Sequence, residues 1–265
     1  MSGILNIQFQ PVLGKKDENL EKVRKYLEES ADKKLDLVVL PEFFSTGIDH
    51  SSFLNFPEDE NGGETIKNIC TLAKEYKTNI VAGTVIEKSD EKLFNTSFII
   101  NRDGEIVDKY RKIHLFDYMG GTEGQRITAG DRQVVVKLDF AKIGMGICYD
   151  IRYPLHYKNL AKTGAEIIVL PTAWVVPEEI FNNRLALENA QDLWVAMNRT
   201  RAFDNLVYTV SCNQWDRGCI GKSLIVAPTG MVMSDAENKQ GGFYVDVDLD
   251  IVKAYKSIYP ISSID

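Results

Sequence analysis

The sequence predicts a mixed α/β fold of four layers, in which two sheets pack face to face and carry helices on their outer faces. Apolar strand-like runs alternate with helical patterns along the chain. Each half contains a hairpin, and both halves follow the same order of elements. A sheet with helices on one face must bury its other face, so two such halves form an α-β-β-α sandwich. The 265 residues are 44% hydrophobic and 26% charged, which fits one compact domain over residues 1–265.

In the first half the patterns predict, in chain order, a helix over 20–31, a buried strand over 35–44, a helix with an apolar face over 66–76, a strand-like run over 79–87 and a hairpin over 94–110. Asp17 is a candidate N-cap for the first helix. Cys70 lies on the apolar face of the second helix and is interpreted as a core residue. Asp103 and Gly104 are a typical turn sequence for the hairpin.

The second half repeats this order, with strands over 142–147 and 165–174, a long helical segment from about 178 to 202, a strand over 205–213 and a hairpin over 222–236. Leu40 corresponds to Leu170 at an offset of 130 residues, and Ser97 to Ser223 at an offset of 126. The near-constant offset indicates an internal pseudo-two-fold repeat. A single doubly wound sheet remains the alternative fold. Hairpins in both halves favour the sandwich.

The overall charge and the cysteine content exclude several classes of protein. A formal charge of -7 without a Lys/Arg stripe argues against nucleic acid or an anionic membrane as the partner. The N-terminus lacks a secretory pattern, and no apolar run approaches the ~20 residues of a membrane helix. The four cysteines form no C-x-x-C pair, so reduced thiols are expected. We therefore expect a soluble, cytoplasmic protein that binds a small molecule.

Cys148 ends an apolar run at a strand-to-helix junction, shortly before Pro154. A free cysteine is most often a packed core residue. A catalytic cysteine needs a base, a positive charge or a helix N-terminus, because a thiol is only weakly ionised at neutral pH. His114 and His156 offer a cysteine–histidine alternative, although the sequence around Cys148 has neither the papain-type motif C-G-[SA]-C-[WY] nor a G-x-C-x-G nucleophile elbow.

Two other residues could supply the base and the cation. Glu42 follows a buried run and precedes two phenylalanines, so burial should raise its pKa towards that of a general base. It could equally cap a helix or pair with an arginine. Alternation along the strand places Tyr110 and Lys112 on one face, and a lysine that points inward needs an anionic neighbour. A solvated strand edge is the alternative for Lys112. The backbone N–H of Tyr149 could help to stabilise an oxyanion.

Five separated segments carry a family resemblance: PE at 41–42, KIHLFD at 112–117, TEGQRITAGD at 122–131, GICYDIRYP at 146–154 and RAFDN at 201–205. In order and spacing they resemble the nitrilase superfamily of carbon-nitrogen hydrolases. The resemblance covers nearly the whole chain.

The resemblance implies a Glu-Lys-Cys triad, with Glu42 as general base, Lys112 as oxyanion stabiliser and Cys148 as nucleophile. Glu123 matches a second family glutamate, although its polar, glycine-flanked surroundings would otherwise indicate a surface loop. The family fold is the α-β-β-α sandwich, in dimers or larger assemblies. The family uses no metal or organic cofactor, and the sequence has no metal-ligand or dinucleotide motif.

The chain departs from the family pattern in two places. Leu155 stands where a glutamate is frequent, and the segment 177–194 is longer than the usual loop. The loops after 118 and 174 are the predicted pocket walls, with Tyr149 and Trp174 as substrate-binding residues. These differences concern the substrate and leave the triad intact.

The sequence therefore predicts an amide hydrolase that works by acyl transfer through a cysteine thioester and releases ammonia. A small ω-amide of a carboxylic acid is the favoured substrate. The alternatives are an N-carbamoyl compound, a nitrile, or a catalytically idle binding member of the family. We expect a homodimer or larger homo-oligomer whose interface includes the segment after Cys148, within 153–180.

Overall fold

The computed structural model describes residues 1–48, 55–117, 121–216 and 218–259. Its helices are α1 (Lys16–Glu28), α2 (Gly63–Glu75), α3 (Pro154–Lys162), α4 (Glu178–Phe181), α5 (Arg184–Asn205) and α6 (Asp250–Ile258). Short 3-10 helices cover Glu123–Gln125 and Cys148–Arg152. No helix within these described ranges has the length and apolar composition needed to cross a bilayer.

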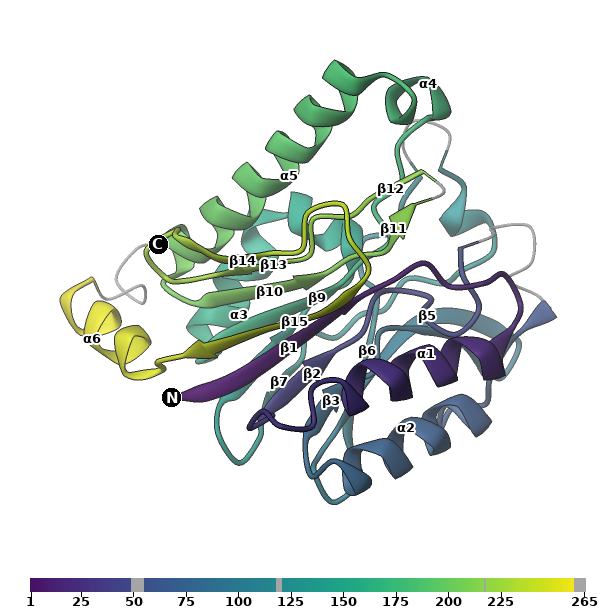
Figure 1. Ribbon diagram of the computed structural model, residues 1–265, viewed down its shortest axis with the longest axis horizontal. Helices are drawn as coiled ribbons and strands as arrows, with labels where there is room; N and C mark the ends of the chain where they lie inside the picture. The colour runs from purple at the N-terminus through teal and green to yellow at the C-terminus, as the bar shows by residue number, and fades with distance from the viewer. Residues whose placement is uncertain (49–54, 118–120, 217, 260–265) are drawn as a thin grey trace.

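The strands form two large sheets (Figure 1). The first contains β1 (Ser2–Gln8), β2 (Leu37–Val39), β3 (Asn79–Val81), β4 (Val85–Ser89), β5 (Lys92–Ile100), β6 (Ile106–Arg111) and β15 (Gly241–Val247). The second contains β7 (Val135–Lys137), β8 (Lys142–Met145), β9 (Ile167–Pro171), β10 (Tyr208–Cys212), β13 (Leu224–Val226) and β14 (Val232–Asp235). A small ribbon of β11 (Trp215–Asp216) and β12 (Cys219–Ile220) lies outside them.

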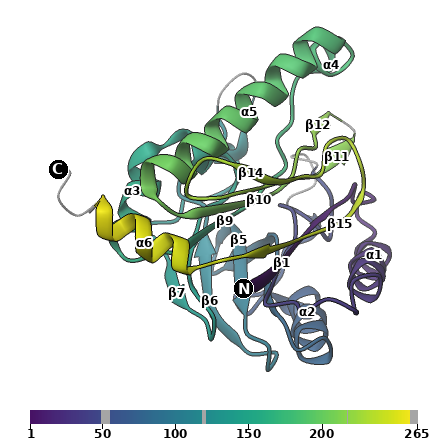
Figure 2. The same cartoon turned by 60° about the vertical axis from the view of Figure 1, so that its left-hand side comes forward.

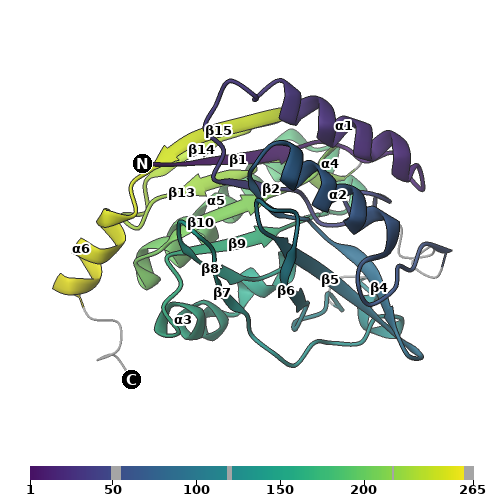
Figure 3. The same ribbon diagram turned by 90° about the horizontal axis from the view of Figure 1, so that it is seen from below.

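The two sheets pack face to face, and helices cover both outer faces (Figures 2 and 3). One apolar cluster fills the space between the sheets and includes Val39 from β2, Met145 from β8 and Val169 from β9. A second cluster joins the first sheet to α1 and α2, and a third joins the second sheet to α3 and α5. The four-layer prediction is confirmed, and the doubly wound single sheet is wrong.

The internal repeat is visible in the order of the strands. In the first sheet β1, β2 and β3 are parallel neighbours, and β5 pairs antiparallel with β3. In the second sheet β8, β9 and β10 are parallel neighbours, and β13 pairs antiparallel with β10. β2 leads to Glu42, and β8 leads to Cys148. In this correspondence β2 matches β9 and β8 matches β1, so Glu42 and Cys148 follow different strands of the repeat.

Three predicted elements differ in detail. Asp17 lies in the first turn of α1, where a negative charge favours the helix dipole, but it is not the N-cap. The strand-like run 79–87 is broken into β3 and β4 around Gly83. The helical segment after Pro177 is split into α4 and α5, because the side chain of Asn183 caps α5 by accepting the N–H of Ala186.

Gly83 is required by a close backbone approach. Its φ is +45°, and a Cβ atom there would lie 2.1 Å from the carbonyl oxygen of Pro41. Only glycine fits such a contact without displacing the backbone. The break between β3 and β4 therefore supports the segment that carries Glu42.

Candidate active site

Glu42 lies in the loop that follows β2 and is almost completely buried, with 1% of its surface exposed. Its Oε1 accepts hydrogen bonds from Asn95 Nδ2 at 2.8 Å and from Lys112 Nζ at 3.0 Å, and its Oε2 accepts the N–H of Ala173 at 2.8 Å. Burial raises the pKa of Glu42 and the charge of Glu123 adds to this, although Lys112 opposes them. A carboxylate with a raised pKa is a competent general base near neutral pH.

Lys112 follows the end of β6, and its side chain points inward, as the alternation of that strand predicted. Its Nζ donates to Glu42 Oε1 at 3.0 Å and to Glu123 Oε2 at 2.9 Å. Burial alone would lower the pKa of Lys112, but the charges of Glu123, Glu42 and Cys148 raise it well above its usual range. The ammonium therefore stays charged. It has three N–H donors; two are used by the carboxylates, and the third has no hydrogen-bond acceptor among the described residues.

Glu123 opens a short 3-10 helix and is 1% exposed, so it is not a solvated loop residue. Its Oε2 accepts from Lys112 Nζ and from the N–H of Phe116 at 2.8 Å, and its Oε1 accepts from Asn95 Nδ2 at 3.0 Å. Burial alone would raise the pKa of Glu123, but Lys112 and these hydrogen bonds bring it below its usual value. Glu123 is therefore the ionised partner of the lysine.

Cys148 begins the 3-10 helix that follows β8 and lies on the inner apolar cluster. Its φ of +46° falls in the left-handed region, which L residues other than glycine seldom adopt. Burial raises the pKa of the thiol well above its usual value and the charge of Glu42 adds to this, whereas Lys112 opposes them. The resting thiol is therefore protonated and needs a base before it can act as a nucleophile.

Asp150 ties the turn of Cys148 to the segment that carries Lys112. Its buried carboxylate accepts four hydrogen bonds, from Tyr110 Oη at 2.7 Å, from the N–H of Ile147 at 2.8 Å, from the N–H of His114 at 3.1 Å and from His114 Nδ1 at 2.6 Å. These contacts fix the turn that carries Cys148 against the end of β6.

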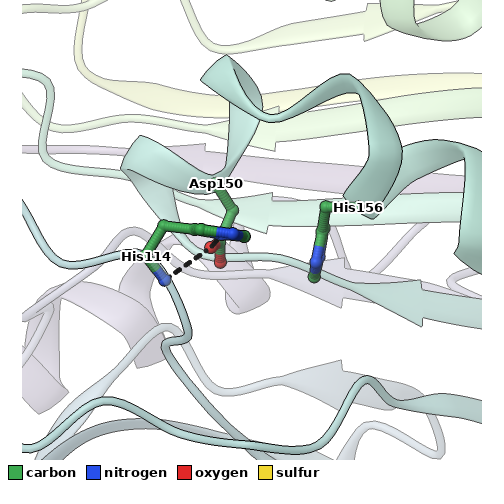
Figure 4. Close-up of side chains that lie close together, drawn as sticks. All are labelled: His114, Asp150 and His156. Atoms are coloured by element: carbon green, nitrogen blue, oxygen red, sulfur yellow. Dashed lines mark hydrogen bonds and ion pairs between the residues drawn. The ribbon is translucent and has the colours of Figure 1, made fainter.

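His114, Asp150 and His156 lie close together, with potential ligand atoms within 4.8 Å of one another (Figure 4). His156 Nε2 lies 2.9 Å from the carbonyl oxygen of Met145, which can only accept, so Nε2 carries the proton. His156 Nδ1 then accepts from Gln133 Nε2 at 3.0 Å. Both ring nitrogens are occupied, so His156 has no free lone pair for a metal or for a thiol proton. His114 is hydrogen-bonded to Asp150, whereas His156 is hydrogen-bonded to Met145 and Gln133, and His156 does not support the cysteine–histidine alternative.

The two predicted substrate-binding residues lie around one arginine. The guanidinium carbon of Arg152 is 5.7 Å from the ring centroids of both Tyr149 and Trp174. Tyr149 also contacts Phe116, and Trp174 also contacts Trp194. Arg152 is exposed, and no ion pair or hydrogen bond of its side chain occurs among the described parts of the chain. The predicted wall after residue 118 begins with 118–120, which lie outside the described residues.

Sequence reasoning missed three residues of this region: Asn95, Asp150 and Arg152. Asn95 is one of three consecutive buried polar residues on β5, with Thr96 and Ser97, and lies directly opposite Lys112. A buried polar residue on the inward face of a strand was the signal that could have identified it. Asp150 and Arg152 stand inside the Cys148 motif, but their contacts depend on residues from other segments.

The chain matches the family model described as carbon-nitrogen hydrolase over residues 6–257. It is 33% identical to nitrilase homolog 2 of Dictyostelium discoideum over 94% of this chain and 76% of that protein. It is 30% identical to the 2-oxoglutaramate amidase of Bacillus subtilis, over 96% of this chain and 94% of that protein.

A yeast protein gives both a sequence and a structural match. The chain is 28% identical to the omega-amidase NIT3 of Saccharomyces cerevisiae, over 92% of this chain and 86% of that protein. The crystal structure of Saccharomyces cerevisiae Nit3, a member of the nitrilase superfamily, superposes with a TM-score of 0.86 at 25% identity and covers 99% of this chain and 96% of that one.

Proposed function

Because the chain belongs to the carbon-nitrogen hydrolase family, we propose that it hydrolyses the terminal amide of a small carboxylic acid, with Cys148 as the nucleophile. The observation that carries the proposal is the buried array of Glu42, Lys112 and Glu123, whose charges act on Cys148. Buried charges are costly unless they are paired, and their concentration around one thiol is typical of a catalytic site.

In the proposed reaction Glu42 takes the proton of the Cys148 thiol, and the sulfur attacks the amide carbon. The third N–H of Lys112 and the backbone N–H of Tyr149 stabilise the oxyanion. The tetrahedral intermediate collapses, and ammonia leaves with the proton that Glu42 had taken. Water then attacks the thioester while Glu42 again acts as base. The carbon–sulfur bond breaks, the proton returns to the thiol, and the acid is released.

Arg152 supports a substrate that carries a carboxylate at the end opposite the amide. Its guanidinium lies near Tyr149 and Trp174 and has no anionic partner among the described residues. A guanidinium binds a carboxylate through two parallel hydrogen bonds. Similar proteins are named omega-amidase and 2-oxoglutaramate amidase, which fits an ω-amide of a dicarboxylic acid.

Ammonia release from a panel of compounds tests this proposal. The panel contains ω-amides of dicarboxylic and 2-oxo dicarboxylic acids, N-carbamoyl amino acids, and nitriles of matched length. We expect the highest kcat/KM for the acid-bearing ω-amides. A higher value for the ureido acids or the nitriles would assign the alternative chemistry, and no turnover of any compound would favour a binding protein.

Arg152→Met is expected to raise KM for an acid-bearing ω-amide about 30-fold, because a charge-assisted hydrogen bond contributes about 1.5–3 kcal/mol. The uncharged amide of the same length should be turned over as by the wild type. Arg132→Met is the control, since Arg132 is an exposed arginine paired with Asp108. Equal losses on the charged and the uncharged amide would exclude a carboxylate-binding role.

We also propose a homodimer that buries the segment after Cys148. Tyr153 and Leu155 are exposed at 39% and 70%, and α5, which packs beside α3, exposes Leu193 at 58%. Exposed apolar side chains on neighbouring elements are typical of an interaction surface. Light scattering at micromolar concentration should give twice the mass of the chain, and Leu155→Glu should shift it towards the monomer. A monomeric mass for the wild type would contradict this interface.

The reduced state of the thiols supports the proposed cytoplasmic location. Cys70, Cys148 and Cys212 form no disulfide within the described part of the chain, and the proposed nucleophile must remain unoxidised to attack an amide. The reaction needs no cofactor, because the nucleophile, the base and the oxyanion donors are side chains and backbone groups of the chain itself.

A further inference from the structure

Asn95 lies between the two carboxylates of the site. Its Nδ2 donates to Glu42 Oε1 at 2.8 Å and to Glu123 Oε1 at 3.0 Å, and the residue is completely buried. Ionised carboxylates can only accept hydrogen bonds, so the amino end of the amide must face them. Both N–H groups of the side chain are used in this way. One neutral residue therefore joins two charged ones.

Asn95 also holds Lys112 directly. Its backbone carbonyl accepts the N–H of Lys112 at 2.9 Å, so the two residues are neighbours across β5 and the end of β6. The four side chains then form a closed ring in which two donors, Asn95 and Lys112, alternate with two acceptors, Glu42 and Glu123. Each member is held by two others.

The chemistry of the amide suits this place in the ring. A cation in place of Asn95 would, together with Lys112, neutralise both carboxylates and weaken Glu42 as a base. A carboxylate in this place would repel Glu42 and Glu123. An amide donates two hydrogen bonds and adds no charge. It therefore fixes the spacing of Glu42 and Glu123 and leaves the charge balance around Lys112 unchanged.

The hydrogen-bond donors to Glu42 and Glu123 show what removal of the Asn95 amide would do. Asn95 is the hydrogen-bond donor to Glu123 Oε1 in the described structure. Without it, this oxygen would be free to compete for the third N–H of Lys112, which the proposed reaction directs to the oxyanion. Glu42 Oε1 would keep Lys112 as its donor but would lose one of its two hydrogen bonds.

We propose that Asn95 is a positioning residue that holds Glu42 and Glu123 on either side of Lys112 and so keeps one N–H of the lysine available to the reacting atoms. This inference rests on the proposed function and deepens it, because it concerns the same site. Asn95 acts through its neighbours, and it is not a catalytic residue.

The test compares Asn95→Leu with a matched control, Asn79→Leu. Asn79 is equally buried on the neighbouring β3, also donates two hydrogen bonds, to the carbonyl of Asp36 and to Asp139 Oδ1, and likewise has an unpartnered Oδ1. Its partners lie outside the ring. Asn95→Leu should lower kcat at least ~10-fold with KM within about threefold, since a hydrogen bond to a charged group contributes about 1.5–3 kcal/mol. Asn79→Leu should leave both constants unchanged.

The pH dependence gives a readout that a packing defect would not move. Lys112, Glu123 and Cys148 are the charged or titratable groups that act on Glu42, and all remain in the variant. The bond from Asn95 lowers the pKa of Glu42, so its loss raises that pKa. The acid limb of kcat/KM should therefore move up by about one pH unit in Asn95→Leu. It should not move in Asn79→Leu.

Alkylation of Cys148 by iodoacetamide makes the test independent of any substrate. The rate of alkylation depends on the coupled ionisation of Glu42 and the Cys148 thiol. Its pH profile should therefore move to higher pH in Asn95→Leu. Asn95→Asp keeps the shape and removes at least one of the two donors, and its charge, when ionised, also raises the pKa of Glu42; it should shift the profile in the same direction and serves if the leucine variant does not fold. The inference would be overturned by a folded Asn95 variant whose kcat and whose pH profiles of kcat/KM and alkylation match those of the wild type. If the wild type hydrolyses no amide, the proposed function fails, while the alkylation profile still decides the role of Asn95.

Discussion

Cys148→Ala is expected to abolish amide hydrolysis and to leave the fold intact. The variant loses the only group that can form the thioester in the proposed reaction, so kcat should fall by at least ~10⁴-fold. Alanine is smaller than cysteine and equally apolar, so the inner cluster that Cys148 contacts should keep its packing. Ammonia release and circular dichroism measure the two halves of this prediction.

Cys70→Ala is the matched control for this experiment. Cys70 lies on α2, on the outer side of the first sheet, and packs against the cluster between that sheet and its helices. It should retain wild-type kcat, and iodoacetamide should still inactivate it. Substantial turnover in Cys148→Ala would show that another group attacks the substrate.

Glu123→Gln is expected to lower kcat at least ~10²-fold, which is roughly 2.7 kcal/mol in the activation barrier. The glutamine keeps the shape but cannot accept at both ends. In the wild type Oε1 accepts from Asn95, and Oε2 accepts from Lys112 and from the N–H of Phe116. An amide nitrogen at either place would face another donor. If the nitrogen faces Lys112, the lysine keeps only Glu42 as its acceptor; if it faces Asn95, the lysine keeps an acceptor but loses its ionised partner.

The same substitution should shift the pH dependence in a defined direction. The negative charge of Glu123 raises the pKa of Glu42, so its removal lowers that pKa. The acid limb of kcat/KM should move to lower pH in Glu123→Gln. This shift is opposite to the one expected for Asn95→Leu, so the two variants distinguish loss of a charge from loss of a donor.

Glu87→Gln is the control for a buried, paired carboxylate outside the site. Glu87 is fully buried on β4 and pairs with Lys109 and Arg111. We expect this variant to be less stable but to retain kcat within about threefold, because surface and structural ion pairs act on folding and not on the reacting atoms. If Glu123→Gln instead retains near wild-type kcat, Glu123 has no part in catalysis, and only Glu42, Lys112 and Cys148 remain as candidate catalytic residues.

Much of the fold follows from local patterns in the sequence. Alternation along one strand correctly predicted that Tyr110 and Lys112 are buried on one face, because successive side chains of a strand point to opposite faces. The repeat followed from the matching order of elements in the two halves and from their near-constant offset in sequence. The break at Gly83 was missed, since it arises from the approach of Pro41, a residue from a different strand connection.

The site was predictable only in part. Glu42, Lys112, Glu123 and Cys148 were identified through motifs, and their catalytic roles remain predictions. The part played by Asn95 could not be deduced, because it depends on three segments, near 42, 112 and 123, that meet only in the folded chain. Asp150 is similar, because its four donors come from two separate segments.

The pairing of the first and the last strands of the sheets has a consequence for the order of folding. β15 is hydrogen-bonded to β1, with Ser2 opposite Val247, and β1 in turn pairs with β2, which leads to Glu42. Contacts this distant in sequence form slowly, since a loop of almost the whole chain must close first. During synthesis the first sheet stays without its edge strand until residues 241–247 have left the ribosome. We therefore expect the nascent chain to acquire activity only after residues 241–247 have emerged, and a chain truncated before β15 to remain inactive.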